Sequence, residues 1–317
     1  MSGTAFVFPG QGSHVVGMGK DIYDAFPVAR ATFAEADDTL GFALSDLCFN
    51  GPEETLRDTI NQQPALLTVS IALWRCLKSA GAPLEARYLA GHSLGEYSAL
   101  VASGTLDFAD AVRLVRERGR VMKDAGSTHP GAMAAIIGMD DNALADVCRE
   151  ASAQSGGLGV VCANYNAPGQ VAISGEVAAL ERAIALAKER GARRAIPLAV
   201  SIASHSPLMQ SAAQRFAAAV AAAPVRQASA PVVANVTAQP IVTVSDIRKE
   251  MVEQLTSPVR WTASIQYMTA QGVTQFIEVG PKDVLSGLIK RIDSTVSAVS
   301  VGDAAGIAHV AAGESHV

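Results

Sequence analysis

The sequence predicts an α/β protein with two parts: a large domain whose mostly parallel sheet is flanked by helices, and a small domain inserted into it. Three observations lead to this prediction. Strand-like runs alternate with helical patterns near both ends of the chain, which is typical of parallel sheets. The middle of the chain follows a different order, βαββαβ. The 317 residues are 49% hydrophobic, enough to bury a sizeable core.

The first third of the chain alternates strands and helices. An apolar run at 5–8 breaks into a loop rich in proline and glycine, as a buried strand does at its end. The apolar stretch 64–77 predicts a helix that begins at Pro64, because proline favours the first helical position. A short strand then ends at Gly91, and an amphipathic helix is expected from about Asp107 to about Asp124.

The segment 128–199 carries the βαββαβ order, with strand-like runs at 131–139, 158–166, 169–174 and 193–199 and helical patterns at 140–152 and 176–190. This order is typical of ferredoxin-like domains. We expect the large domain to be discontinuous and to consist of 1–127 and 200–302. Residues 303–317 show no convincing periodicity, and we expect a flexible tail there.

The composition excludes several classes of function. The net charge is −5 and the Lys and Arg residues are scattered, so no basic surface for nucleic acid is expected. No apolar run is long enough to cross a membrane. The four cysteines lack the CxxC spacing of metal and redox sites. We therefore expect a cytoplasmic protein without a metal ion that binds neither nucleic acid nor membranes.

Ser93 lies in the motif Gly91-His92-Ser93-Leu94-Gly95, at a predicted turn from a strand into a helix. In a nucleophile elbow of the α/β-hydrolase type, flanking glycines allow a crowded turn that exposes the serine hydroxyl, and the helix N-terminus offers amide donors to an oxyanion. A serine at this position can equally be a helix N-cap. The pattern alone therefore leaves open whether Ser93 is a nucleophile.

A serine nucleophile needs a base, and the chain has six histidines. One adjoins Ser93, where neighbouring side chains of an extended segment point in opposite directions; one lies in a turn, and two lie in the expected tail: His92, His129, His309 and His316. His14 follows a glycine-rich loop. His205 follows an apolar run, as catalytic residues at strand ends do, and we favour it over His14 as the general base.

Arg118 falls on the apolar side of the helix predicted near 107–124. Its neighbours at helical spacing are apolar: Leu114, Val115, Val121 and Met122. Burying an unpaired guanidinium costs several kcal/mol, so an anion should meet it. That anion is either an internal carboxylate or the carboxylate of a substrate, which the planar guanidinium would hold in a bidentate pair.

The sequence contains, in this order, the motifs FVFPGQGS, NQQPALLTVS, GHSLGEYSAL, RGRVM, NAPGQVAISG, ASH, SPVRW and EVGPKDVL. Together these motifs, which run from about Ala5 to about Ile292, resemble those of the malonyl-CoA:acyl carrier protein transacylases. The likeness is greatest to the free-standing enzyme of bacterial fatty-acid synthesis. The acyltransferases that serve polyketide synthases in trans are nearly as similar.

The resemblance implies a role for each matching position. Ser93 would carry the malonyl group as an oxyester, and His205 would act as general base and then as general acid. The backbone amides of Gln11 and Leu94 would form the oxyanion hole. The backbone carbonyl of Gln254 would orient the histidine in place of an acidic side chain. Of two further positions, Arg118 would pair with the free malonyl carboxylate, and Gln63 matches a glutamine near the pocket.

The implied reaction is transfer of a malonyl group from malonyl-CoA to the phosphopantetheine thiol of an acyl carrier protein, by a ping-pong mechanism without a bound cofactor. A hydrolase on the same scaffold, such as a proofreading thioesterase, and a non-catalytic binding module are the alternatives. We expect a monomer. Carrier proteins are typically acidic, and two basic groups are candidates to receive one: Lys188, Arg190, Arg193 and Arg194, and the pair Lys290 and Arg291.

Overall fold

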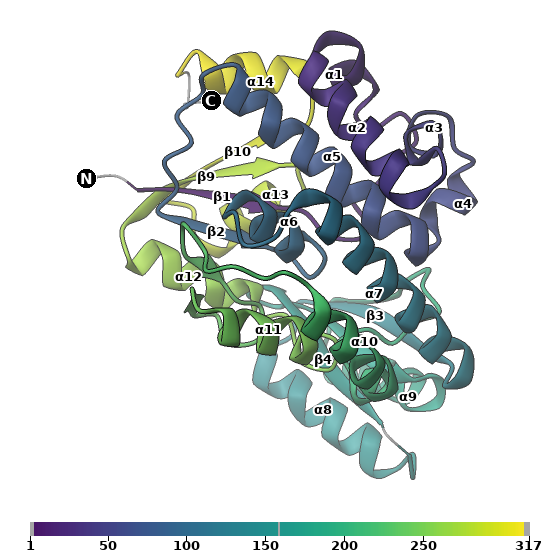
Figure 1. Cartoon of the computed structure of the whole chain (residues 1–317). Helices are drawn as coiled ribbons and strands as arrows, with labels where there is room; N and C mark the ends of the chain where they lie inside the picture. The colour runs from purple at the N-terminus through teal and green to yellow at the C-terminus, as the bar shows by residue number, and fades with distance from the viewer. Residues whose placement is uncertain (1–2, 158, 314–317) are drawn as a thin grey trace.

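The computed structural model of the chain describes residues 3–157 and 159–313. Within them, helices pack around two sheets (Figure 1). The larger sheet has the spatial order β10-β9-β1-β2-β7-β8, in which every neighbouring pair is parallel except the last. Its strands are β1 (Gly3–Phe8), β2 (Tyr88–Gly91), β7 (Val232–Val233), β8 (Pro240–Ile241), β9 (Val273–Val279) and β10 (Ser297–Val301).

The larger sheet is buried on both faces. The side chains of β1 alternate between them, as the two-residue period of a strand requires: Phe6 and Phe8 join one core cluster, and Ala5 and Val7 join another. The first cluster includes residues of α5 (Thr59–Ser79) and α6 (Gly95–Ala102). The second includes residues of α12 (Trp261–Ala270) and α13 (Val284–Ile292). This layering is the α/β architecture that the sequence predicts.

The other helices around the larger sheet are α1 (Lys20–Ala25), α2 (Pro27–Leu40), α3 (Leu44–Asn50), α4 (Glu53–Arg57), α7 (Phe108–Thr128), α10 (Gln210–Ala222), α11 (Val244–Glu253) and α14 (Ala304–Ala311), with the short 3-10 helix η1 (Pro207–Met209). The amphipathic helix expected from about Asp107 is α7, and it continues further than predicted. Over 3–157 and 159–313, no helix combines the length and the apolar character needed to cross a bilayer.

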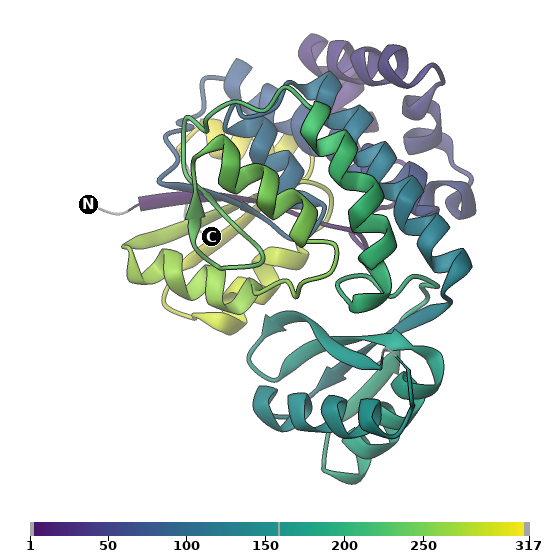
Figure 2. The same ribbon diagram turned by 60° about the horizontal axis from the view of Figure 1, so that its bottom comes forward.

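The second sheet is antiparallel, with the order β4-β5-β3-β6 (Figure 2). Its elements are β3 (Gly131–Ile137), α8 (Asp141–Ala153), β4 (Val160–Ala167), β5 (Gln170–Glu176), α9 (Val177–Glu189) and β6 (Arg194–Pro197). Both helices pack on one face of this sheet. The order along the chain is βαββαβ, so the predicted fold class, a mostly parallel sheet with helices plus a small ferredoxin-like unit, is confirmed.

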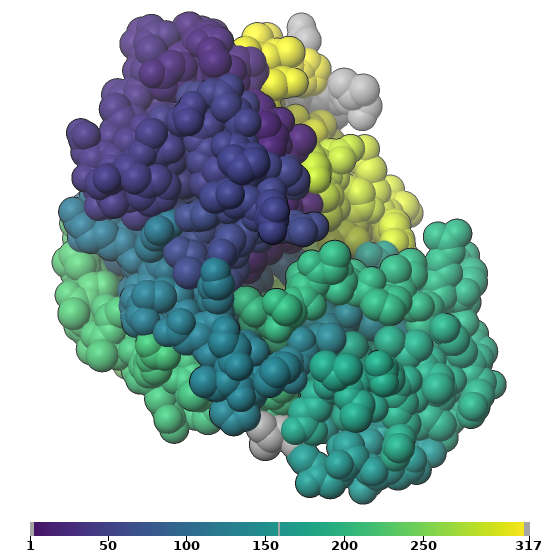
Figure 3. Space-filling view, turned by 90° about the vertical axis from the view of Figure 1, so that its right-hand side faces the viewer, coloured from purple at the N-terminus to yellow at the C-terminus, as the bar shows by residue number. Residues whose placement is uncertain are grey.

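Backbone pairing joins the small sheet to the rest of the molecule. Tyr165 N donates to Val259 O at 2.9 Å, and Val259 N donates to Ala163 O at 2.8 Å. These bonds tie β4 to the segment that leads into α12. Figure 3 shows a hollow in the surface between the N-terminal segments, drawn in purple and blue, and the segments of the small sheet, drawn in teal and green.

The predicted start of the helix at Pro64 is wrong. This helix, α5, begins at Thr59, where the side chain of Asp58 accepts the Ile60 N–H, and Pro64 lies inside it. A proline inside a helix cannot donate to the carbonyl four residues earlier. That carbonyl, Ile60 O, accepts a hydrogen bond from Arg116 Nη1 at 3.2 Å instead. A tertiary contact thus satisfies the group that the proline leaves unpaired.

The flexible tail predicted at 303–317 is wrong for the residues of α14. This helix runs over Ala304–Ala311, and Ile307 and Val310, three residues apart, are buried on one side of it. Two apolar residues in an alanine-rich stretch are too short a pattern to stand out in the sequence. His316, in the same predicted tail, lies outside the described residues.

Candidate active site

Ser93 occupies a crowded turn between β2 and α6. Its φ is +51°, in the left-handed region that residues other than glycine rarely adopt. A Cβ atom on Gly91 would lie 1.9 Å from the carbonyl carbon of Gly95, and a Cβ on Gly95 would lie 2.0 Å from Phe8 O. Only glycine fits at both positions, so the motif forms a strained turn with the geometry of a nucleophile elbow.

His205 lies against Ser93. Its Nε2 is 2.8 Å from Ser93 Oγ, and its Nδ1 is 2.7 Å from the backbone oxygen of Gln254. A carbonyl oxygen only accepts, so Nδ1 carries the proton and Nε2 accepts from the serine hydroxyl. His205 also has a positive φ, +59°. The serine and the histidine that the sequence favours as nucleophile and base therefore form a hydrogen-bonded pair.

The imidazole of His205 is electrically neutral near pH 7. Burial, followed by the positive charge of Arg118, lowers the pKa of His205 from 6.5 to about 3. A neutral imidazole can accept a proton, which is what a general base must do. The Gln254 carbonyl opposes the shift, because it accepts a hydrogen bond from the protonated ring as well.

The guanidinium of Arg118, on α7, is fully buried and has neutral hydrogen-bond partners. Nη1 donates to Gln63 Oε1 at 2.8 Å. Nη2 donates to Gln254 Oε1 at 2.9 Å and to Ser93 Oγ at 3.2 Å. The guanidinium also lies over the ring of Tyr97, with 5.5 Å between the guanidinium carbon and the ring centroid. In the described part of the chain, no carboxylate forms an ion pair with Arg118.

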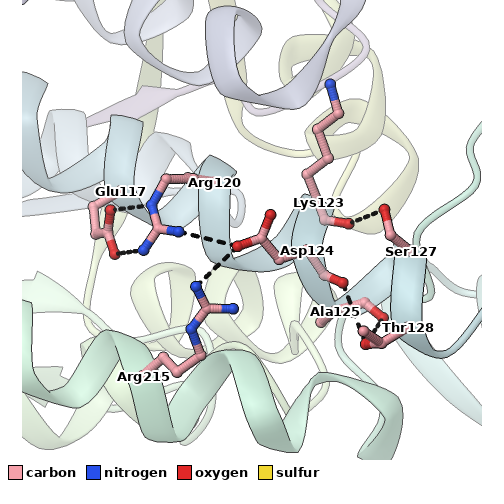
Figure 4. Close-up of polar contacts among 8 residues, drawn as sticks. All are labelled: Glu117, Arg120, Lys123, Asp124, Ala125, Ser127, Thr128 and Arg215. Carbon is pink, nitrogen blue, oxygen red and sulfur yellow. Dashed lines mark hydrogen bonds and ion pairs between the residues drawn. The ribbon is translucent and has the colours of Figure 1, made fainter.

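The exposed face of α7 offers a contrast to the buried Arg118, because the arginines there pair with carboxylates (Figure 4). Arg120 donates to the carboxylates of Glu117 and Asp124, and Arg215 of α10 donates to Asp124 Oδ2 at 2.9 Å. Each of these solvent-exposed cations has an anionic partner. Of the two anions that the sequence allows for Arg118, an ion-paired internal carboxylate is absent from the residues described, although the buried Glu96 is close enough to act on its charge.

Gln11 and Leu94, the two expected oxyanion donors, both adjoin the turn. Leu94 directly follows the serine at the N-terminus of α6. Gln11 belongs to the loop after β1, where a Cβ on Gly10 would lie 2.3 Å from His92 O. The side-chain amide of Gln11 donates to Gln62 Oε1 at 2.5 Å.

The remaining histidines have other surroundings. Gln62 Nε2 lies 2.6 Å from Nδ1 of His14, the second candidate base. His92 Nε2 lies 2.8 Å from Asn166 Oδ1, on the small sheet. Two further histidines lie at the C-terminal end of α7 and in α14: His129 and His309. The structure brings only His205 of the described histidines to Ser93 Oγ.

Sequence reasoning missed Asn235 and the side chain of Gln254. Asn235 Oδ1 accepts the Ser93 N–H at 2.7 Å, and Gln254 Nε2 donates to Ser93 O at 3.1 Å. Asn235 follows β7, which pairs in parallel with β2. Because the carboxyl ends of parallel strands meet at one edge of a sheet, a polar residue directly after the apolar segment 230–234 was the available signal.

Comparison with known proteins agrees with this geometry. The acyl transferase domain family matches residues 5–309. The chain is 49% identical over 303 residues to the malonyl CoA-acyl carrier protein transacylase of Bacillus subtilis strain 168, covering 96% of this chain and 94% of the relative. It is 48% identical over 308 residues to the Escherichia coli K12 protein of the same name, covering 97% of this chain and 98% of that relative.

A solved structure is similar over nearly the whole chain. It comes from a complex of a type II polyketide synthase acyl-carrier protein with its malonyl-transacylase. The match has a TM-score of 0.95 and 46% sequence identity, and it covers 98% of this chain and 100% of the other. The chain therefore belongs to the malonyl CoA-acyl carrier protein transacylase family.

Proposed function

We propose that this protein transfers a malonyl group from malonyl-CoA to the phosphopantetheine thiol of an acyl carrier protein, through a malonyl oxyester on Ser93. One observation carries the proposal: the buried guanidinium of Arg118 lies 3.2 Å from the Ser93 hydroxyl and has neutral partners. A malonyl group attached to Ser93 would bring its free carboxylate to this cation. Membership of the family supports the same assignment.

In the first half-reaction, His205 Nε2 removes the proton of Ser93 Oγ while the oxygen attacks the thioester carbonyl of malonyl-CoA. The Gln254 carbonyl stabilises the imidazolium through Nδ1. The backbone N–H groups of Gln11 and Leu94 stabilise the oxyanion, each contributing about 3 kcal/mol. The C–S bond then breaks, and the thiol of CoA leaves with the proton that the imidazolium returns.

In the second half-reaction, the phosphopantetheine thiol of the carrier protein takes the place of CoA. His205 accepts the thiol proton, the sulfur attacks the oxyester carbonyl, and Ser93 Oγ leaves with the proton. Both thiols end the same phosphopantetheine arm, so one site can serve both half-reactions. The result is a ping-pong mechanism, in which Ser93 carries the acyl group after CoA has left and before the carrier thiol attacks.

Arg118 gives the site its preference for an acyl group with a carboxylate. Its hydrogen bonds to Gln63 and Gln254 orient the guanidinium but leave its charge unpaired. An acetyl group cannot pair with that charge, so the buried cation would remain without an anion beside the reacting serine. Selection of this kind depends on the difference between the two acyl groups in transition-state binding.

The carrier protein can belong to fatty-acid or to polyketide synthesis. The relatives are named for an acyl carrier protein without a stated pathway. The similar solved structure, in contrast, contains the carrier protein of a type II polyketide synthase. Transfer rates to both carriers, measured side by side, distinguish them. We also propose that the protein works as a monomer in the cytoplasm, where free thiols such as its four cysteines are usual.

Labelling with radioactive malonyl-CoA tests the proposal. The wild-type protein should take up one malonyl group, and Ser93→Ala should take up none. Ser98→Ala, a buried serine on α6, is the matched control and should be labelled like the wild type. Label on Ser93→Ala would contradict the assignment. Release of malonate as fast as CoA, without any carrier protein, would show a hydrolase instead.

A further inference from the structure

Two side-chain amides hold the backbone of Ser93 from opposite ends of the residue. Asn235 Oδ1 accepts its N–H at 2.7 Å, and Gln254 Nε2 donates to its carbonyl at 3.1 Å. Both amides are buried, with 1% and 0% of their surface exposed. A residue other than glycine in the left-handed region is strained and persists only where its surroundings hold it there. The two amides supply that restraint.

The Gln254 amide also fixes the direction of the Leu94 N–H. The carbonyl of Ser93 and the N–H of Leu94 belong to one planar trans peptide group, so they point in opposite directions. With the carbonyl directed at Gln254 Nε2, the N–H points to the other side of the peptide. This N–H is the proposed oxyanion donor, and its position relative to Ser93 Oγ follows from the held peptide.

Asn235 is itself fixed by all of its polar groups. Its Nδ2 donates to Gly91 O at 2.7 Å, its backbone N–H donates to Glu96 Oε2 at 2.8 Å, and its carbonyl accepts the Arg260 N–H at 2.9 Å. The side-chain amide has a single workable orientation, because a flipped amide would set Nδ2 against the Ser93 N–H and Oδ1 against the Gly91 carbonyl. Its oxygen therefore faces the serine.

The loop that carries Asn235 is anchored on two helices. Glu96 belongs to α6, and Glu250 of α11 accepts the Val236 N–H at 2.9 Å. Burial and the proximity of the two carboxyls raise the pKa of Glu96 well above its usual range, and burial raises the pKa of Glu250 to about 7. Loop, elbow and α11 thus form one connected set of hydrogen bonds.

We infer that Asn235 is a positioning residue for acylation: together with the Gln254 carboxamide it clamps the backbone of Ser93 and so sets the directions of Oγ and of the Leu94 N–H. The inference rests on the proposed function, since it concerns the step in which malonyl-CoA acylates Ser93. The clamp also touches the substrate site, because Arg118 Nη2 donates to Gln254 Oε1 at 2.9 Å.

The test is the rate constant for the first burst of CoA release after rapid mixing with malonyl-CoA. Asn235→Leu keeps the size of the side chain and removes both hydrogen bonds. We expect its acylation rate constant to fall roughly 10- to 100-fold, the usual effect of misplacing a reacting group by about 1 Å. The Kd for malonyl-CoA should stay within about twofold, because Asn235 makes no hydrogen bond to Arg118 or Gln63.

A purely structural role would give a different result. Loss of folded protein lowers the amplitude of the burst and leaves its rate constant unchanged. Ser103→Ala is the matched control: it removes buried hydrogen bonds at the far end of α6, away from Ser93, and should lower stability without slowing acylation. If Asn235→Leu cannot be purified, Asn235→Ser, whose short side chain cannot reach both partners, replaces it with the same expectation.

A wild-type rate constant in the Asn235 variant, whatever its amplitude, would overturn the inference. Absence of malonyl-Ser93 in the wild-type protein would instead overturn the proposed function. The two failures are therefore distinguishable, the first by the rate constant of the burst and the second by labelling of the wild-type protein with radioactive malonyl-CoA.

Discussion

Ser93, His205 and Arg118 act on one another over very short distances. Ser93 Oγ is 2.8 Å from His205 Nε2 and 3.2 Å from Arg118 Nη2. The guanidinium therefore lies beside the base as well as beside the nucleophile, and its charge adds to the effect of burial on the pKa of His205. The arginine that would bind the substrate carboxylate thus adds to burial in lowering the pKa of the base in the free protein.

The low pKa of His205 predicts an unusual pH profile. A base with an ordinary pKa of 6.5 loses activity about tenfold per pH unit below that value. In His205 the pKa is lowered to about 3, so the ring stays neutral and able to accept a proton as the pH falls. We expect kcat/KM for malonyl-CoA to change less than about threefold between pH 8 and pH 5.5. A fall of about fivefold from pH 6.5 to 5.5, as a base with a pKa of 6.5 gives, would contradict this account.

Local patterns made the three site residues candidates, and the family resemblance assigned their roles. A serine stands between glycines, a histidine follows an apolar run, and an arginine stands on the apolar face of a helix. Asn235 stands in no such pattern, since a polar residue at a strand end is ordinary, and its partner Ser93 is 142 positions away in the chain. The role of the Gln254 side chain was hidden for the same reason, because only the fold brings it to Ser93.

Among the helices and strands, the patterns predict the alternation of the larger sheet and the βαββαβ order of the smaller one. They do not predict the strands β8 and β10 at the edges of the larger sheet, the helices α1 to α4, or several ends. The start of α5 depends on the Asp58 cap and on Arg116, which compensates for Pro64 from another helix. The helix α14 exists because Ile307 and Val310 find a core to pack on. Such ends are decided by tertiary contacts that a periodic pattern does not contain.

Glu278, at the end of β9, holds the N-terminus of α13. Its carboxyl oxygens accept the N–H groups of Leu285 at 3.1 Å and Ser286 at 2.7 Å. Burial outweighs these bonds and raises the pKa of Glu278 from 4.5 to about 7. A carboxyl with a raised pKa favours the folded state while it is protonated, so its contribution is complete below pH 4.5 and is lost as the pH rises through 7.

Glu278→Gln isolates this contribution, because the amide does not titrate. We expect the difference in unfolding free energy between wild type and variant to shift against the wild type by on the order of 2 kcal/mol from pH 5 to pH 8. Urea denaturation at the two pH values measures it. Glu181→Gln, at an exposed carboxyl on α9, is the control. A difference that is the same at both pH values would refute the assignment.

At the scale of the whole molecule, the site lies where β1, β2 and β7 end, and the small sheet stands beside it. Asn166, on β4, reaches His92 next to the serine, so the small sheet contacts the elbow directly. The hollow in Figure 3 lies between this sheet and the N-terminal segments. A carrier protein that delivers its thiol to Ser93 would therefore approach past the small sheet.

Charge reversal on the small sheet tests that approach. Arg193 directly precedes β6 and Arg194 is its first residue, and both are exposed. Changing both to Glu should raise the KM for an acidic carrier protein about tenfold and leave acylation by malonyl-CoA unchanged, because only the carrier meets that surface. Arg149→Glu with Arg182→Glu, on α8 and α9, is the control of equal charge. An unchanged KM for the carrier would place its docking surface elsewhere.

The most direct test of the central claim compares malonyl and acetyl transfer in Arg118→Ala, with Arg120→Ala, exposed on the same helix, as the control. If Arg118 selects the substrate carboxylate, its loss should lower the rate of Ser93 labelling by malonyl-CoA at least 100-fold, the cost of one bidentate pair of about 3 kcal/mol. Labelling by acetyl-CoA should stay the same or increase. An equal fall in both rates would contradict the account, because Arg118 would then support the fold and not the choice of substrate.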